Sequence, residues 1–359
     1  MRISALAITV GLVGLPALSL AAPDIYGRFD VSLDNRSDYP GSSARSLLSD
    51  IPSVLPPGGG LLVDAWELES NSSRIGIRGS EALLDEGLRV IYQYETQIDV
   101  DGDGQAFTIR NAFLGLDTNV GKFFAGNYDS VTKLADGDLD QFDDTPADMG
   151  AVFLGQHRNN NSLNWQSPSY GGVSLMLQAA PGEADVTGID VRDGVADTLG
   201  ASVTFEQDIL YAALAYEQGF DEMDFPAPLG AGVGVDTQIA RGSIGVSLDN
   251  GVAFGAIVEM FELEPLIVGS DKLDGRSWLV GGKFAATDRV TVKAQYSMLD
   301  SGDLDTELSV LTVGGEYRLG KQTMMYALAS RADTEIGTAA PARIDESGNL
   351  LSLGMRHKF

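Results

Sequence analysis

The chain lacks cysteine and has only two histidines, His157 and His357, among its 359 residues. Without thiols there is neither a disulfide framework nor thiolate chemistry. Two histidines leave little material for a histidine metal site or for the base that an enzyme's nucleophile needs. The composition therefore argues against a catalytic protein.

Basic residues are also scarce, since 24 Lys and Arg stand against 51 Asp and Glu and give a net charge of −27. A chain this acidic repels phosphate backbones, so nucleic acid is excluded as a partner. Acidity of this size fits a protein that lives in salt water or meets divalent cations, and it also fits simple solubility of long surface loops.

Long apolar runs are confined to the N-terminus. Arg2 precedes the uncharged residues 3–20, and the small residues Ser19 and Ala21 follow the spacing that a signal peptidase requires. We therefore expect a signal peptide at 1–21 and one mature domain at 22–359, whose net charge is −28 because only Arg2 is lost (−27 − 1). After residue 22 no run of about 18 apolar residues occurs, so no membrane-spanning helix is expected.

The dominant period after residue 24 is two. In residues 290–299 one face carries Val290, Val292, Ala294, Tyr296 and Met298, and the other carries Thr291, Lys293, Gln295 and Ser297. Residues 199–206 and 311–319 alternate in the same way. Such alternation predicts strands that are apolar on one side and wet on the other.

The strands recur regularly along the chain. We expect them at 24–34, 66–79, 88–99, 106–117, 121–129, 157–167, 173–180, 198–206, 210–218, 239–248, 252–261, 276–286, 290–299, 308–319, 323–331 and 349–359. Short connections such as 207–209 alternate with long ones such as 35–65 and 130–156. In an exported chain, sixteen strands joined by alternately short and long connections predict an all-β fold. We expect a 16-stranded antiparallel transmembrane β-barrel with short periplasmic turns and long extracellular loops.

Aromatic residues near the strand ends are expected on the lipid side, because amphipathic rings prefer the membrane–water boundary. The candidates for such girdles are Phe29, Tyr94, Phe284, Tyr296, Tyr317 and Tyr326.

Four segments resemble the general, non-specific trimeric porins of Gram-negative bacteria, of the type common in Neisseria. They are residues 25–30 (IYGRFD), 73–81 (SRIGIRGSE), 112–116 (AFLGL, running into Gly121 and Gly126) and 353–359 (LGMRHKF). Together with the strand layout they span the mature chain. The second and fourth segments are the specific ones.

The resemblance implies an outer-membrane protein that forms a water-filled channel for passive diffusion of ions and small hydrophilic solutes. It also implies a homotrimer surrounded by membrane lipid and lipopolysaccharide, with an inward-folded third loop and no cofactor. The terminal Phe359 resembles the signal that the barrel-assembly machinery reads.

Arginines share the polar face of the first strands, because side chains two apart on a strand point the same way. Arg28, Arg74, Arg78, Arg89 and Arg110 have this parity. The resemblance implies that the side chains at Arg74, Arg78, Arg110 and Arg158 form a basic wall at the narrowest point of the pore.

The third long connection carries the opposite charge, and we expect it to face that wall through Asp136, Asp138, Asp140, Asp143 and Asp144. Opposed rows of charge would create a transverse field that favours dipolar, hydrophilic solutes. The acidic loops predict a weak cation preference. The alternative interpretation is a solvated acidic loop on the rim of the barrel, and the stretch P-E-F-G common in related loops is missing here.

Residues 99–104 (DVDGDG) match the opening of a calcium-binding loop through Asp99, Asp101 and Asp103. The twelfth position would be Arg110 instead of the bidentate Glu, so the segment is no EF-hand. Weak binding of a structural Ca²⁺ and a plain solvated hairpin are both open, and the incomplete motif favours the hairpin.

Three other functions compete with a general channel. A barrel enzyme would need a base that the composition barely supplies. An adhesin with a filled lumen would need a smaller barrel, because sixteen strands leave an aqueous channel. A solute-specific channel for phosphate would need basic loops, whereas these loops carry Asp.

Overall fold

A computed structural model describes residues 22–40, 62–83, 87–102, 105–182, 194–223, 233–265, 271–303, 305–337 and 343–359. The expected signal peptide at 1–21 lies outside these residues. No helix in the described part of the chain is both long and apolar enough to cross a membrane.

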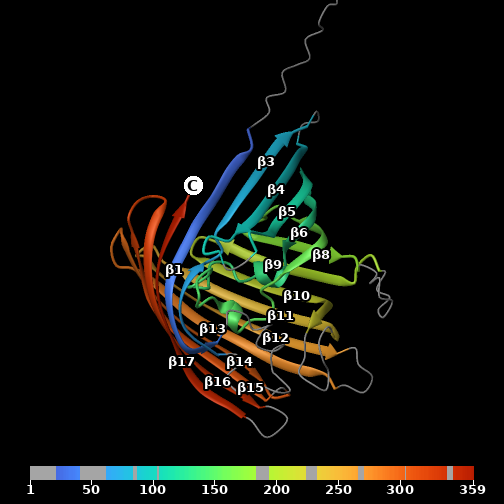
Figure 1. The fold of residues 1–359 in the computed structure, drawn as a ribbon. Helices are drawn as coiled ribbons and strands as arrows, with labels where there is room; N and C mark the ends of the chain where they lie inside the picture. The colour runs from blue at the N-terminus through green and yellow to red at the C-terminus, as the bar shows by residue number, and fades with distance from the viewer. Residues whose placement is uncertain are drawn as a thin grey trace, which may run out of the picture.

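Antiparallel strands make up nearly all of the described chain (Figure 1). They are β1 (Asp24–Pro40), β2 (Leu62–Ser70), β3 (Arg74–Ala82), β4 (Arg89–Ile98), β5 (Phe107–Thr118), β6 (Gly121–Asp129), β7 (Arg158–Gln166), β8 (Val173–Ala180), β9 (Thr198–Gln207), β10 (Leu210–Met223), β11 (Val233–Ser247), β12 (Val252–Pro265), β13 (Leu273–Ala285), β14 (Val290–Ser301), β15 (Thr306–Arg318), β16 (Thr323–Gly337) and β17 (Arg343–Lys358). Between β6 and β7 lie a short helix, α2 (Val131–Leu134), and a 3-10 turn, η1 (Met149–Ala151).

The sheet closes on itself. From β3 to β17 each strand pairs with the next one in sequence, and β1 completes the ring by pairing with β17 on one edge and with β2 and β3 on the other. Because β2 and β3 occupy consecutive stretches along β1, the seventeen segments fill sixteen positions around the barrel. The expected 16-stranded antiparallel barrel is confirmed.

The break between β2 and β3 is a difference from the single strand expected at 66–79. Ser72 has a φ of 50°, which interrupts the extended backbone. The Ser73 hydroxyl donates to the Asp30 carbonyl and accepts from the Asp30 amide, and the Asn71 amide group donates to Tyr326. Side chains thus replace part of the ladder, which is how an irregularity persists inside a sheet.

The alternation of side chains agrees with the period of two. Leu311 and Val313 are exposed on the outer face, whereas Thr312 points inward and is buried. Phe29, Tyr94, Phe284 and Tyr317 are exposed as expected for an outer girdle. Tyr326 contradicts the expectation, because its ring points inward and its hydroxyl donates to the Asp30 carboxylate.

Residues 130–157, here called the inward loop, fold into the barrel (Figure 1). Its apolar side chains, among them Leu139, Phe142, Met149 and Phe153, are buried against the inner wall. The wall supplies an apolar patch for them, made of Ile239, Ile257, Leu279, Leu299, Leu308, Leu328 and Leu350. The third loop therefore narrows the lumen as expected, and it is held there largely by burial of apolar surface.

Candidate functional site

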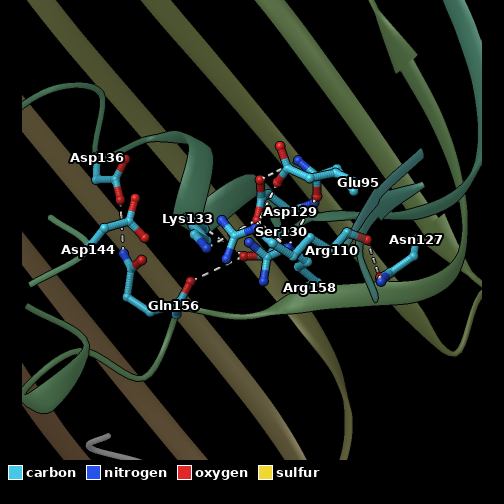
Figure 2. Close-up of polar contacts among 12 residues, drawn as sticks. Glu95, Arg110, Asn127, Asp129, Ser130, Lys133, Asp136, Asp144, Gln156 and Arg158 are labelled. Atoms are coloured by element: carbon cyan, nitrogen blue, oxygen red, sulfur yellow. Dashed lines mark hydrogen bonds and ion pairs between the residues drawn. The ribbon is translucent and has the colours of Figure 1, made fainter. Parts of the chain in front are cut away.

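The basic wall is built from alternate residues of neighbouring strands. Arg28 on β1 stands opposite Arg74 on β3 in the antiparallel register, and Arg110 and Arg158 come from β5 and β7. Because alternate side chains of a strand share one face, this register brings the guanidiniums to one side of the lumen. Figure 2 shows Arg110 and Arg158 on the wall with Glu95 and Asp129 beside them.

Asp144 carries the acidic side of the constriction. Its carboxylate lies 2.7 Å from the Arg28 guanidinium and 3.3 Å from that of Arg74. The Asp144 backbone has a φ of 57°, a left-handed conformation that Asp tolerates better than most residues. Burial by itself would raise the pKa of Asp144, but Arg28, Arg74 and Arg110 outweigh it and hold that pKa well below its usual range.

The other four aspartates of the expected acidic row lie elsewhere. Asp136 accepts a hydrogen bond from Gln156, and Asp138 and Asp143 are exposed. Asp140 accepts hydrogen bonds from the backbone amides of Phe142 and Met149 and from the Gln295 side chain of β14. Among the described residues, only Asp144 of this set forms an ion pair with the arginine wall. Asp136 and Asp140 therefore hold the shape of the loop through hydrogen bonds and do not pair with the arginine wall.

Burial raises the pKa of Asp140 to about 7, with the charge of Asp143 as the next cause. Burial also raises the pKa of Asp136 to about 7, partly offset by Arg241. Both groups lie in the inward loop, so the loop carries less negative charge near neutral pH than its composition suggests.

The four arginines expected in the wall divide into two groups. Arg74, Arg110 and Arg158 lie near the inward loop, where Arg158 pairs with Asp129 at 3.0 Å. Arg78 lies nearer the rim of short turns: it is exposed, lies over the Tyr26 ring and pairs with Asp24 at 2.9 Å. Arg78 therefore pairs with Asp24 near the rim and does not pair with Asp144, unlike Arg74.

Sequence reasoning missed several members of the site. Arg356 bonds Asp30 on β1 and donates to the Asp144 carbonyl of the loop at 3.1 Å. Glu95 stands inside the basic wall, and Lys133 of α2 pairs with Asp129 at 3.1 Å. A signal was available for two of them, because the inward parity of Arg356 follows from the outward parity of Met355, and Glu95 alternates with the outward Tyr94.

A buried ion pair fixes both ends of the inward loop to the far wall. Arg241 of β11 and Glu259 of β12 bond each other, and both are fully buried. The Arg241 guanidinium donates to the Thr132 carbonyl at 2.9 Å, and Glu259 accepts from the amides of Leu154 and Gly155 at 2.8 and 3.2 Å. This pair was not foreseen, because only the tertiary fold brings 132, 154 and 259 together.

Residues 99–102, the described part of the DVDGDG segment, follow directly after β4. Asp101 accepts from the Ser70 amide at 2.6 Å, and Asp99 accepts from the Gly102 amide. Asp103 lies outside the described residues. In the described part of the chain, the carboxylates close enough together to share a cation are instead those of Asp140, Asp143 and Asp148 in the inward loop.

Phe359 closes the barrel. Its backbone amide and carbonyl exchange hydrogen bonds of 3.0 Å with Gly27, and its ring lies 5.6 Å from the Phe29 ring on the outer face. A Cβ at Gly27 would fall 2.5 Å from the Phe359 ring, so glycine makes room for the terminal side chain.

Known proteins of the same kind share this architecture. A family model described as Gram-negative porin matches residues 5–337. The major outer membrane protein P.IB of Neisseria meningitidis is 23% identical over 365 residues, covering 96% of this chain and 99% of the relative. The structure is similar to an anion-selective porin from Comamonas acidovorans (TM-score 0.73, 19% identity, 94% and 99% of the two chains).

A second structure, the trimer form of an outer membrane protein of Vibrio cholerae, has a TM-score of 0.66 at 14% identity over 94% of this chain and 99% of that chain. The family model covers most of the sequence, and the barrel is the fold that the two solved structures share with this chain. The chain belongs to the Gram-negative porin family, whose members are channels of the outer membrane.

Proposed function

We propose that the pore lets ions and small hydrophilic solutes diffuse passively, with a weak preference for cations. The observation that carries this proposal is the pairing of Asp144 on the inward loop with Arg28 and Arg74 on the wall. Charges of opposite sign facing each other in a narrow lumen set up a transverse field, which favours polar over apolar solutes.

The sign of the preference follows from charge compensation. Each arginine near the inward loop has a carboxylate partner: Asp144 for Arg28 and Arg74, Glu95 for Arg110, and Asp129 for Arg158. Three carboxylates thus face four arginines, so the wall keeps one unit of free positive charge to attract anions. The acidic mature chain adds negative potential over about a Debye length, roughly 8–10 Å near physiological salt.

The Comamonas acidovorans porin is described as anion-selective, so the fold alone does not fix the sign. Reversal potentials across a planar bilayer under a KCl gradient test the proposal. We expect a small reversal potential of the sign that indicates a preference for potassium, and we expect it to grow as the salt concentration is lowered. A clearly anion-selective wild-type pore would show that the arginines outweigh their partners.

We infer a homotrimer, in keeping with the trimer form of the Vibrio cholerae relative. Strands β4–β9 have 8 to 12 residues and β10–β17 have 12 to 16, so one side of the barrel is lower. The outward glycines Gly27 and Gly79 leave no depression for a partner, because Phe359 and Tyr92 cover them. Light scattering in mild detergent distinguishes a trimer from a monomer.

The outer surface suits membrane lipid, and we infer that the polar rim meets lipopolysaccharide. Near the long-loop ends of β12–β14, ion pairs such as Lys272–Glu264 (3.2 Å) and Arg276–Asp300 (2.8 Å) lie on exposed side chains. We also infer that Phe359 serves recognition by the barrel-assembly machinery, since it ends the last strand on the lipid side. We propose no bound cofactor and treat the 99–106 connection as a structural hairpin.

We further propose that the protein is a channel without catalytic activity. His157 contacts Glu217 at 2.6 Å and His357 contacts Thr323 at 2.8 Å. Within the described residues, neither histidine is bonded both to a hydroxyl nucleophile and to an orienting carboxylate, the combination that acyl transfer requires.

A further inference from the structure

We propose that Glu95 of β4 is a specificity-determining residue of the pore, because its carboxylate cancels part of the positive charge of the arginine wall and so keeps the channel from becoming anion-selective. This inference rests on the proposed channel function. It names the residue that sets the sign of the ion preference and assigns it to the barrel wall, apart from the inward loop.

Glu95 is enclosed by the wall it neutralises. One carboxylate oxygen lies 2.7 Å from Nε of Arg110, and the other lies 3.7 Å from Nε of Arg74. The Tyr26 hydroxyl donates to that second oxygen at 2.9 Å. Only 7% of Glu95 is exposed, so its orientation is fixed by these three partners.

A glycine makes this arrangement feasible. Gly76 stands opposite Glu95 in the register of β3 and β4, and a Cβ there would fall 2.5 Å from the Tyr26 ring. Without a side chain at Gly76, the ring crosses β3 and reaches the carboxylate. Gln93 donates to the same hydroxyl at 2.8 Å, which orients the Tyr26 proton toward Glu95.

The contacts form a continuous chain of alternating charge. It runs Arg28–Asp144–Arg74–Glu95–Arg110, with three guanidiniums and two carboxylates and hence a net charge of +1. Removing the charge of Glu95 would make the same chain +2. In a narrow aqueous lumen with low-dielectric walls, one unit of fixed charge changes the local concentration of ions strongly.

The two carboxylates of this chain differ in where they are attached. Asp144 belongs to the inward loop, so its replacement changes both charge and loop position. Glu95 belongs to a paired strand, so its replacement changes charge while the loop keeps its anchors. Asp129 is less informative, because it also bonds Asn111 and Lys133 where the loop begins.

The test compares wild type with Glu95→Gln in planar bilayers under a KCl gradient. Gln keeps the shape, and its one carbonyl oxygen can still accept from Arg110 while its amide group faces the Tyr26 hydroxyl. We expect the reversal potential to move toward the chloride value, with a severalfold rise in the chloride-to-potassium permeability ratio and a similar conductance in concentrated salt. Glu95→Asp keeps the charge and should stay close to wild type.

Glu206→Gln is the matched control. Glu206 has the inward parity of β9, is exposed, and has no ion pair among the described residues. This variant also removes one negative charge, but at a position that does not belong to the arginine chain. We therefore expect a much smaller shift of the reversal potential. Equal shifts for the two variants would overturn the inference, since total charge would then explain both.

A double variant, Glu95→Gln with Arg110→Gln, separates charge from structural damage. It restores the net charge of the chain, so the reversal potential should return toward the wild-type value. A double variant that stays anion-shifted would overturn the inference. A Glu95→Gln pore with the same reversal potential as wild type would overturn the inference and leave the proposed channel function intact. A wild-type protein that forms no conducting pore would overturn both the inference and the channel function.

Discussion

The Asp144 carboxylate lies 2.7 Å from the Arg28 guanidinium, which joins the tip of the inward loop to the first strand of the barrel. The same carboxylate reaches Arg74, so a single residue of the loop faces two arginines of the wall. The loop backbone is held there as well, because Arg356 donates to the Asp144 carbonyl. Charge and position of the loop are therefore coupled at this residue.

Replacing Asp144 by Asn should shift the reversal potential toward anions, because Arg28 and Arg74 lose the partner they share. We expect a severalfold change in the permeability ratio for potassium and chloride, measured in a bilayer under a salt gradient. Asp138→Asn is the control, since Asp138 is exposed on the same loop without an ion pair among the described residues. Equal effects of the two variants would argue against a special role for Asp144.

Replacing Glu259 by Ala should loosen the inward loop. The variant leaves Arg241 buried without its partner, which costs about 3–5 kcal/mol for a buried ion pair, and it removes the acceptor of two loop amides. Single-channel recordings should show larger and noisier currents, and thermal unfolding should begin at a lower temperature. The outward-facing Glu262→Ala serves as control, and currents as quiet as wild type in Glu259→Ala would contradict the anchoring role.

The loop should respond to pH through Asp140. Its pKa in the folded protein, about 7, lies above its usual value, so the folded loop binds more protons than the unfolded chain between those values. Stability is therefore greatest below the unfolded pKa and falls as pH rises through about 7. We expect quieter currents at pH 5 than at pH 8, and Asp140→Asn should weaken this difference. A pH response identical in that variant would assign it to other groups.

The connection between β4 and β5 should be stable without calcium. Asp101 accepts from the Ser70 amide at the end of β2, and the Ser70 hydroxyl donates to the Ile98 carbonyl. Asp101→Ala should lower the unfolding temperature modestly, because one intramolecular hydrogen bond contributes about 0.5–1.5 kcal/mol to the free energy of unfolding. Thermal melts of wild type in EDTA and in CaCl₂ should coincide. A higher melting temperature in CaCl₂ that disappears in Asp101→Ala would instead establish a calcium site.

The sequence alone determined the barrel. Strict alternation in segments such as 290–299 and 311–319 fixes which face meets lipid, since side chains alternate on every strand. It also determined that Arg74 and Arg110 point into the lumen, whereas the place of Arg158 in the wall came from the resemblance. The prediction of an outer girdle was wrong for Tyr326, because it relied on the aromatic residue type and not on the position in the alternation. The parity of Tyr326 and its hydrogen bond to Asp30 place it inside the barrel.

The tertiary structure decided the constriction. The sequence shows six aspartates in the inward loop, but only the folded loop selects Asp144 to face the arginines and gives Asp140 to the loop's own backbone. Partners such as Glu95 for Arg110 and Glu259 for Arg241 come from neighbouring strands at distances in sequence that no local pattern encodes. Local periodicity specifies which way a side chain points, whereas its electrostatic partner depends on the register between strands and on how the loop packs.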